Sequence, residues 1–393
     1  MVKDIERIER TRKAMQQQKI DVLICRLPEN IVMLTGYWPM NGFAFLVFPV
    51  DKEPVLIVPV PEEELAHEGW VADIRTFKWG LVDSGDPYIT IAALLKQVAV
   101  EFGLAGKRVG YEGSFEFIAA PYVGAEPSVF SQASLAMYQK AFGENLVDAT
   151  GLIHKLRLYK TLAEAERLRT VNHIARLGLK AFVENVVPGN SEIQIASAVE
   201  SAIMQEGTGY NGIKVARAWA SVMSGTRSAT AYKPHLLSTQ RRMENGDFAL
   251  LELATVADGW WSDLTRTRVS GHALSEDLEK WQAVVDAQSA ALAVIRPGVA
   301  SNQVDRAARE VIEKRGLGSY FIHHTGHGLG LRYHEPEPFL HPEVEAVLEA
   351  GMVSSVEPGI YIEGWGGMRC EDNILVTESG VEILSEFPRQ LAD

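Results

Sequence analysis

The sequence predicts a two-domain protein: a small N-terminal α/β domain of residues 1–154, followed by an α+β domain of residues 155–393. Three observations support this prediction. Apolar runs alternate with polar or helical segments up to about residue 150, a strong helix start follows, and the remainder contains two helix–helix–sheet halves. A chain of 393 residues is long enough for two hydrophobic cores.

In the N-terminal part, four strand-like segments alternate with polar or helical sequence: "DVLIC", "GFAFLVFPV", "PVLIVPV" and "KRVGYEG". This order is typical of a small α/β domain, and we find no catalytic motif in it. A long helix then begins in "RLYKTLAEAERLRTVNHIARLGLKAF". Thr161 is a good N-cap and Glu164 completes a capping box, so we place the domain boundary just before this helix.

The C-terminal part contains a faint internal repeat. The spans 188–207 and 297–316 have equal length, and each runs from a Pro-Gly pair to a glycine. Each follows a candidate helix and precedes strand-like sequence, which predicts a pseudo-symmetric α+β domain with its sheets packed together. The alternative is chance, because Pro-Gly after a helix is common.

Charge and composition argue against nucleic acid as a main partner and indicate a compartment. The formal net charge of −13 argues against nucleic acid as a main partner, because phosphate binding needs a basic surface. The two cysteines, Cys25 and Cys370, give no disulfide framework, which favours a reduced, cytoplasmic protein. The charged N-terminus lacks the apolar core of a signal peptide, and no apolar run is long enough to span a membrane.

The stretch "FALLELATVADGWWSDLTRTRV" (residues 248–269) predicts a hairpin. Its Asp-Gly pair favours a two-residue turn, which sets Asp263 opposite Ala254. Glu252 then lies on the same face as Asp263, as its diagonal neighbour and within reach of long side chains. Two carboxylates on one face of a core hairpin need a cation, a shared proton or water between them. A solvated face is the alternative.

The segment "HHTGHGLGLRYHE" contains four histidines. They are His323, His324, His327 and His334, and the pattern leaves open which of them binds a ligand. The glycines between them permit close approach of the backbone to a site. The run lacks the strand–turn–helix context of a dinucleotide motif, and the chain has no HExxH helix, which argues against thermolysin-type zinc chemistry.

Two further acids, Glu357 in "SVEPGIYI" and Glu371 in "MRCEDNILV", have strand-like surroundings. One acid in a strand usually faces solvent, so the set is more informative than any single member. Four carboxylates and one imidazole, all on predicted sheet, match the ligands that suit Mn²⁺, Co²⁺, Fe²⁺ or Zn²⁺.

Four motifs together resemble those of the "pita-bread" metallopeptidases of family M24. They are "WWSDLTRT", "HTGHGLGLRYH", "SVEPGIYI" and "RCEDNILVTESG". The N-terminal segment "DVLICRLPENIVMLTGY" is similar to the creatinase-type domain of the prolidase and aminopeptidase P branch. The resemblance covers nearly the whole chain. It implies a creatinase-like domain over residues 1–154 and a pita-bread catalytic domain over residues 155–393.

Carried onto this sequence, the resemblance implies a site for two divalent metal ions (Mn, Co or Zn). The ligands it implies are Glu252, Asp263, His327, Glu357 and Glu371. Asp263 and Glu371 would bridge the two ions. The implied activity is hydrolysis of an Xaa-Pro peptide bond, in a dipeptide or at a peptide N-terminus, by a metal-bridged hydroxide.

The resemblance also implies roles for residues around the metals. His235 and His334 would hold the substrate carbonyl and stabilise the tetrahedral intermediate, and Glu357 would shuttle the proton. Arg369 would buttress the bridging carboxylates. A homodimer is implied as well, with a small peptide or small amide as the substrate.

The sequence departs from the family at Glu252, where the family has aspartate. The extra methylene lengthens the arm by roughly 1.5 Å. A glutamate can still ligate, with one metal site weakened, or it can mark a branch that has lost that metal. Creatinase and ectoine hydrolase resemble this fold and cleave C–N bonds of small guanidino or cyclic compounds without the metal pair. A non-catalytic binding module is a third interpretation, although such modules lose the ligands that this chain keeps.

Overall fold

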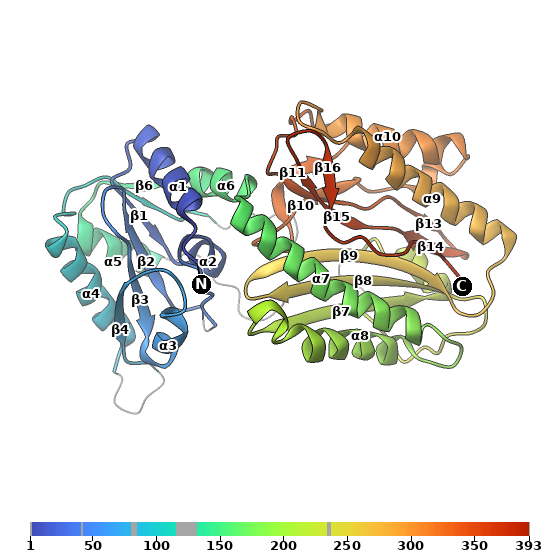
Figure 1. Ribbon diagram of the computed structural model, residues 1–393, viewed down its shortest axis with the longest axis horizontal. Helices are drawn as coiled ribbons and strands as arrows, with labels where there is room; N and C mark the ends of the chain where they lie inside the picture. Colours follow the sequence, from blue (N-terminus) through green and yellow to red (C-terminus); the bar gives the residue numbers. More distant parts are fainter. Residues whose placement is uncertain (1, 41, 80–84, 115–131, 234–236, 393) are drawn as a thin grey trace. The chain divides into compact units, whose positions relative to one another are not determined.

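The computed structural model of the chain describes residues 2–40, 42–79, 85–114, 132–233 and 237–392 (Figure 1). These residues fall into two compact units, of which the first ends at Arg157 and the second begins at Leu158. No helix among the described residues is long and apolar enough to cross a bilayer.

The first unit is built on one mixed sheet. In order across the sheet, its strands within the described residues are β4 (Asp73–Phe77), β3 (Val55–Pro59), β2 (Phe45–Pro49), β1 (Val22–Cys25), β5 (Val109–Tyr111) and β6 (Leu146–Asp148). Strand β2 runs antiparallel to β1 and β3, and the other neighbours run parallel. The four segments that the sequence marks as strand-like contain β1, β2, β3 and β5, so that prediction is confirmed.

Helices accompany this sheet. They are α1 (Ile5–Gln17), α2 (Pro28–Thr35), α3 (Glu63–Ala66), α4 (Pro87–Glu101), α5 (Gln132–Phe142) and α6 (Thr150–Leu158), with a 3-10 turn η1 (Val60–Glu62). Every second residue of a strand points to the same face, and Val22 and Ile24 of β1 pack with Phe45 and Val47 of β2 in one buried cluster. The apolar faces of α4 and α5 complete that cluster, so the core of this unit lies between the sheet and these two helices.

The first half of the second unit is two helices followed by an antiparallel sheet. Its elements are α7 (Leu162–Asn185), α8 (Glu192–Gly207), η2 (Tyr210–Gly212), β7 (Ala216–Ser224), η3 (Gly225–Thr230), β8 (Phe248–Ala257) and β9 (Trp260–Val269). The predicted capping box is confirmed at the start of α7: Thr161 accepts from the Glu164 N–H, and the Glu164 side chain accepts from the Thr161 N–H.

The second half repeats this order. Its elements are α9 (Ser275–Val294), α10 (Ser301–Lys314), η4 (Gly318–Tyr320), β10 (Gly326–Gly328), β11 (Glu335–Leu340), β12 (Val353–Val356), β13 (Gly359–Ile362), β14 (Gly366–Arg369), β15 (Asp372–Val376) and β16 (Val381–Ile383). Within the described residues the sheet order is β11-β10-β12-β15-β16, and β13 and β14 form a separate two-stranded ribbon. The repeat spans 188–207 and 297–316 contain α8 and α10, the second helix of each half. Two helix–helix–sheet halves are therefore confirmed, and Figure 1 shows the strands between the two helix pairs.

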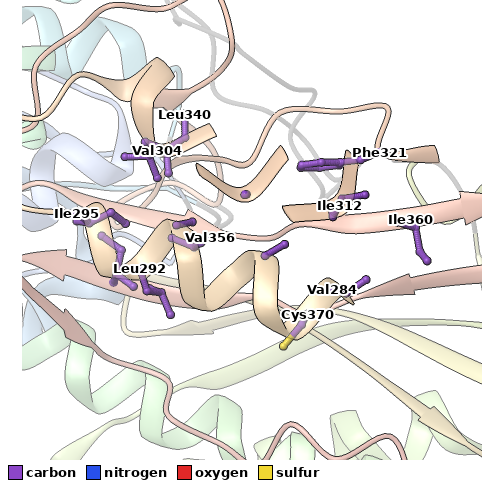
Figure 2. Close-up of a cluster of buried hydrophobic side chains, with 14 of the residues drawn as sticks. Val284, Leu292, Ile295, Val304, Ile312, Phe321, Leu340, Val356, Ile360 and Cys370 are labelled. Carbon is purple, nitrogen blue, oxygen red and sulfur yellow. The ribbon is translucent and has the colours of Figure 1, made fainter. Parts of the chain in front are cut away.

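The core of the second half lies under α9 and α10. Figure 2 shows apolar side chains of α9, such as Val284 and Leu292, in one cluster with Val356 from the end of β12 and Ile360 from β13. Cys370 is buried in the same cluster. Both cysteines are free thiols. This packing holds the strands β12, β13, β14 and β15 in place. These strands flank the acidic side chains described next.

Candidate active site

The β8–β9 hairpin fixes the first two acids. Asp258 and Gly259 both have positive φ, 45° and 86°, as a two-residue turn of the primed type requires. The strands pair Ala254 with Asp263, which confirms the predicted register. Glu252 pairs with Thr265, two pairs further from the turn, and therefore lies on the face of Asp263.

The two later acids do not lie within strands, which corrects the sequence interpretation that every ligand is on sheet. Glu357 follows the end of β12 and precedes β13, and Glu371 falls between β14 and β15. Pro358 has no N–H to donate to a ladder, so the strand is interrupted next to Glu357. The chain leaves one sheet for the β13–β14 ribbon at Glu357 and returns to it at Glu371, so both acids lie at crossings between the two sheets.

The structure brings His327, on β10, to these acids. Its Nε2 atom lies 3.3 Å from Asp263 Oδ2 and 3.4 Å from Glu357 Oε1. All three side chains are nearly inaccessible to solvent. One nitrogen of a buried imidazole thus faces two carboxylate oxygens.

The proton of the His327 ring is on the other nitrogen. Nδ1 lies 2.9 Å from the Gly328 carbonyl, which can only accept a hydrogen bond. Burial lowers the pKa of His327, so the ring is neutral. Nε2 therefore presents a lone pair to the two carboxylates. Acceptors this close need a proton or a metal ion between them.

Glu371 adds a third acceptor. Its Oε2 atom accepts from the Thr265 hydroxyl at 2.8 Å. Its Oε1 atom is buried and has no hydrogen-bond partner among the described residues. Ligand atoms of His327, Glu357 and Glu371 all lie within 4.8 Å of one another. An orphaned carboxylate oxygen beside an imidazole lone pair fits a divalent cation with O and N ligands.

The electrostatics of the acids agree with that fit. Burial raises the pKa of Asp263, and the charge of Glu371 raises it further. Burial likewise raises the pKa of Glu357, with added contributions from the charges of Glu371 and Asp263. Three carboxylates in one dry space repel one another, and a bound dication would remove this repulsion.

Glu252 has a different environment from the other acids. Its Oε1 atom accepts a hydrogen bond from the Tyr333 hydroxyl, and its Oε2 atom forms an ion pair with Arg369. The Thr265 hydroxyl lies 3.2 Å from the same Oε2 atom. Ligand atoms of Glu252, Asp263 and Glu371 also lie within 4.8 Å of one another, so the geometry includes Glu252 in the acidic cluster.

Arg369 is held by residues that the sequence interpretation did not assign. Its Nη1 donates to Tyr361 Oη at 3.1 Å, and Tyr361 lies 3.0 Å from His323 Nε2. The His323 Nδ1 atom bonds to the carbonyl of His324, so its Nε2 accepts from Tyr361. These hydrogen bonds, from His323 through Tyr361, fix the Arg369 guanidinium against Glu252. Tyr333 was also missed, although its place next to His334 in "LRYH" was the available signal.

Most of the predicted site residues line one cavity of about 240 Å³. It is lined by Glu252, Asp263, His327, His334, Glu357 and Arg369, together with further side chains from β7 and the segment after η3. The Nε2 atom of His334 lies 3.9 Å from Asp263 Oδ2. His235 lies outside the described residues.

The comparisons with known proteins identify the family. A model described as "Metallopeptidase family M24" matches residues 166–378. The chain belongs to this family. A second model, "Creatinase/Prolidase N-terminal domain", matches residues 7–159. The predicted M24 resemblance is therefore confirmed, and the chain is a hydrolase of the M24 peptidases.

Relatives of this M24 chain match it over nearly its full length. An Xaa-Pro dipeptidase of Pyrococcus furiosus is 31% identical over 386 residues, which are 98% of this chain and 99% of the relative. The prolidase of Pyrococcus horikoshii superposes with a TM-score of 0.77 at 27% identity, covering 98% of this chain and 99% of that one. An Xaa-Pro dipeptidase of Bacillus anthracis superposes with a TM-score of 0.79 at 28% identity, covering 99% of both chains. Membership of this metallopeptidase family implies that divalent metal ions bind. The cluster of ligand atoms from His327, Glu357 and Glu371 fits such an ion.

Proposed function

We propose that this M24 hydrolase cleaves Xaa-Pro bonds in small peptides in a metal-dependent reaction. The observation that carries the proposal is the unprotonated Nε2 of His327, which faces Asp263 and Glu357. The relatives named Xaa-Pro dipeptidase and prolidase support the substrate. They favour peptide hydrolysis over the alternative of C–N cleavage in a guanidino or cyclic amidine compound.

The proposed cofactor is a pair of divalent ions, with Mn, Co or Zn as the candidates. The ligands would be Glu252, Asp263, His327, Glu357 and Glu371, with Asp263 and Glu371 shared between the ions. Oxygen and imidazole donors without a thiolate suit these metals. When bound, such ions polarise the scissile carbonyl and make a coordinated water acidic enough to react near neutral pH.

The protein's own residues supply the proton transfer. Glu357 is buried and lines the cavity, 3.4 Å from His327 Nε2, where a carboxylate can take a proton from water and return it to the leaving nitrogen. Ser355 Oγ donates to Glu357 Oε1 at 3.1 Å and holds that carboxylate in place. When the leaving nitrogen belongs to proline it carries no proton before cleavage, so this delivery is required.

Histidine would orient the substrate. Burial lowers the pKa of His334, which keeps its imidazole neutral and able to donate an N–H to the substrate carbonyl. His235 is proposed for the same task. Arg369 would keep the acidic cluster in place through Glu252.

The size of the cavity supports a short substrate. At about 240 Å³ it is smaller than the range of about 300–1,000 Å³ typical of sites for drug-sized ligands. We propose a dipeptide rather than a long peptide. We also propose that the enzyme is a cytoplasmic homodimer. Its creatinase-like domain would cover residues 1–154, and its catalytic domain would cover residues 155–393.

The deciding experiment uses full-length protein purified without chelator. We expect bound divalent metal, cleavage of an Xaa-Pro dipeptide, loss of that cleavage after EDTA and dialysis, and recovery on adding Mn²⁺ or Co²⁺. The control substrate is the matching Xaa-Ala dipeptide, whose secondary amide tests the preference for proline. Metal-free protein that hydrolyses a cyclic amidine and leaves the dipeptide intact would contradict the proposal.

A further inference from the structure

Glu192, the first residue of α8, is a fully buried acid outside the acidic cluster. Its Oε1 atom accepts from the Ser224 N–H and from the Ser224 hydroxyl, each at 2.8 Å. Its Oε2 atom accepts from the Thr239 N–H at 2.8 Å and from the Thr239 hydroxyl at 2.7 Å. Arg227 Nη1 lies 3.3 Å from the same Oε2 atom. One carboxylate therefore binds the chain at three positions within residues 224–239.

The described part of residues 224–239, which we call the wall segment, borders the cavity. Ser224 is the last residue of β7, and η3 follows it. After η3 come three residues that line the cavity, namely Ala231, Tyr232 and Lys233. A carboxylate that bonds to both Ser224 and Thr239 fixes the two ends of the wall segment relative to each other. The position of these lining residues therefore depends on Glu192.

Packing alone holds the wall segment only in part. Ala231 lies in a small buried cluster with Tyr361. The ring of Tyr232 packs edge-on against Tyr361, with 5.4 Å between the ring centroids, but Tyr232 remains 40% exposed. Hydrogen bonds to a buried carboxylate are stronger than those between neutral groups. The bonds to Glu192 therefore add a restraint that this packing does not supply.

The side chain of Glu192 does not serve its own helix. A carboxylate in the first turn commonly stabilises the helix that carries it. In α8 the capping box is formed by Ser191 and Gln194, each of which accepts from the backbone N–H of the other. The donors to Glu192 given above all come from the wall segment. The role of this acid is therefore to hold the wall segment rather than to cap α8.

We infer that Glu192 is a positioning residue for substrate binding, because it holds the wall segment so that Tyr232 and Lys233 form one side of the cavity. Glu192 is not among the described residues that line the cavity, so it acts through the wall segment. The inference rests on the proposed function, which supplies the substrate. Loss of the restraint should weaken substrate binding and leave metal binding and the chemical step intact.

The test compares the wild type with Glu192→Gln, both full-length and loaded with Mn²⁺. The amide nitrogen of glutamine cannot accept a hydrogen bond, so the donors of Ser224 or of Thr239 lose their acceptor. We expect KM for an Xaa-Pro dipeptide to rise by about tenfold, kcat to stay within about twofold, and bound Mn²⁺ to be unchanged. This split separates a positioning role from a general loss of folded protein.

Glu164→Gln is the matched control. It changes another buried glutamate in the first turn of a helix, the one that completes the capping box of α7. It should lower stability and leave KM as in the wild type. Thr239→Val covers the case in which Glu192→Gln does not fold, because it removes one donor at an exposed position. It should raise KM by a smaller factor.

Amide hydrogen exchange of residues 225–233 is a second readout that needs no activity. These amides should exchange at least about tenfold faster in Glu192→Gln than in the wild type. Unchanged KM and exchange would overturn the inference and leave the proposed function intact. Loss of bound Mn²⁺, or a lower kcat at unchanged KM, would also overturn it. A wild type that cleaves no Xaa-Pro dipeptide would overturn the proposed function instead, and the exchange comparison would still decide whether Glu192 holds the wall segment.

Discussion

The Nε2 atom of His327 lies 3.3 Å from the Oδ2 atom of Asp263, while the ring proton of His327 is held at the Gly328 carbonyl on the opposite side. This orientation is the one that a metal-binding histidine adopts, because the carbonyl fixes the tautomer and aims the lone pair. Strand β10 carries both His327 and Gly328 and so fixes the tautomer, while β9 supplies Asp263.

His327→Ala should therefore lose bound metal. We expect metal affinity to fall by at least about 100-fold, because a ligand is removed rather than a supporting group. Metal content after dialysis, measured by mass spectrometry, checks this. His272→Ala is the control, as His272 is an exposed histidine of the same unit. Equal metal content in the two variants would contradict the assignment of His327.

Glu357→Gln should slow the reaction, because an amide cannot take up the proton of the attacking water. We expect kcat to fall by about 10²–10⁴-fold. Steady-state kinetics at saturating Mn²⁺ with an Xaa-Pro dipeptide measure the change. Glu363→Gln, at an exposed acid between β13 and β14, should behave as the wild type. A Glu357→Gln variant with wild-type kcat would exclude Glu357 as the proton shuttle.

Gly328→Ala should distort the site through its backbone. A Cβ at this position would meet the Glu337 carbonyl oxygen at 1.9 Å, in the pairing of β10 with β11. We expect a loss of about 1–3 kcal/mol in unfolding free energy, as for overpacked cores, and weaker metal binding through displaced His327. Gly380→Ala is the control, because a Cβ there meets nothing within 4 Å. Thermal unfolding of both variants checks the prediction.

Glu112 should make the stability of the first unit depend on pH. Burial raises the pKa of Glu112, and hydrogen bonds from the Asn30 side chain and the Arg26 N–H lower it. Burial is the larger effect, and the pKa is about 7. The folded state therefore holds this proton over a pH range in which the unfolded chain, with its ordinary pKa near 4.5, has lost it. Unfolding free energy should fall by roughly 3 kcal/mol as pH rises from about 4.5 to about 7.

Glu112→Gln has no proton to lose and should remove that slope. Denaturant unfolding at several pH values, followed for both proteins, measures the difference. Glu144→Gln, at an exposed acid of the same unit, should keep the wild-type slope. Parallel curves for wild type and Glu112→Gln would contradict the raised pKa.

Local features of the sequence predicted local structure well. The Asp-Gly turn and the alternation of the strands set the pairing of Ala254 with Asp263, because a two-residue turn leaves one register open. The capping box of Thr161 and Glu164 likewise marked the start of α7. Both depend on hydrogen bonds between residues a few positions apart, which the sequence displays directly.

The breaks at Glu357 and Glu371 were not predictable in this way. Apolar neighbours made both segments look like continuous strands, whereas each acid lies between two strands of different sheets. Which sheet a strand joins depends on partners far along the chain, and propensity within a short window does not contain that information.

The sequence by itself determined the kind of ligands, the hairpin that presents Glu252 and Asp263, and the family. Only the tertiary structure decided what Glu252 touches. Its bonds to Tyr333 and Arg369 join residues that are 81 and 117 positions from it in the chain, by the difference of their numbers. Contacts of that kind arise when separate strands pack together, and the direction of a side chain in that packing is set by the whole core rather than by its neighbours in sequence.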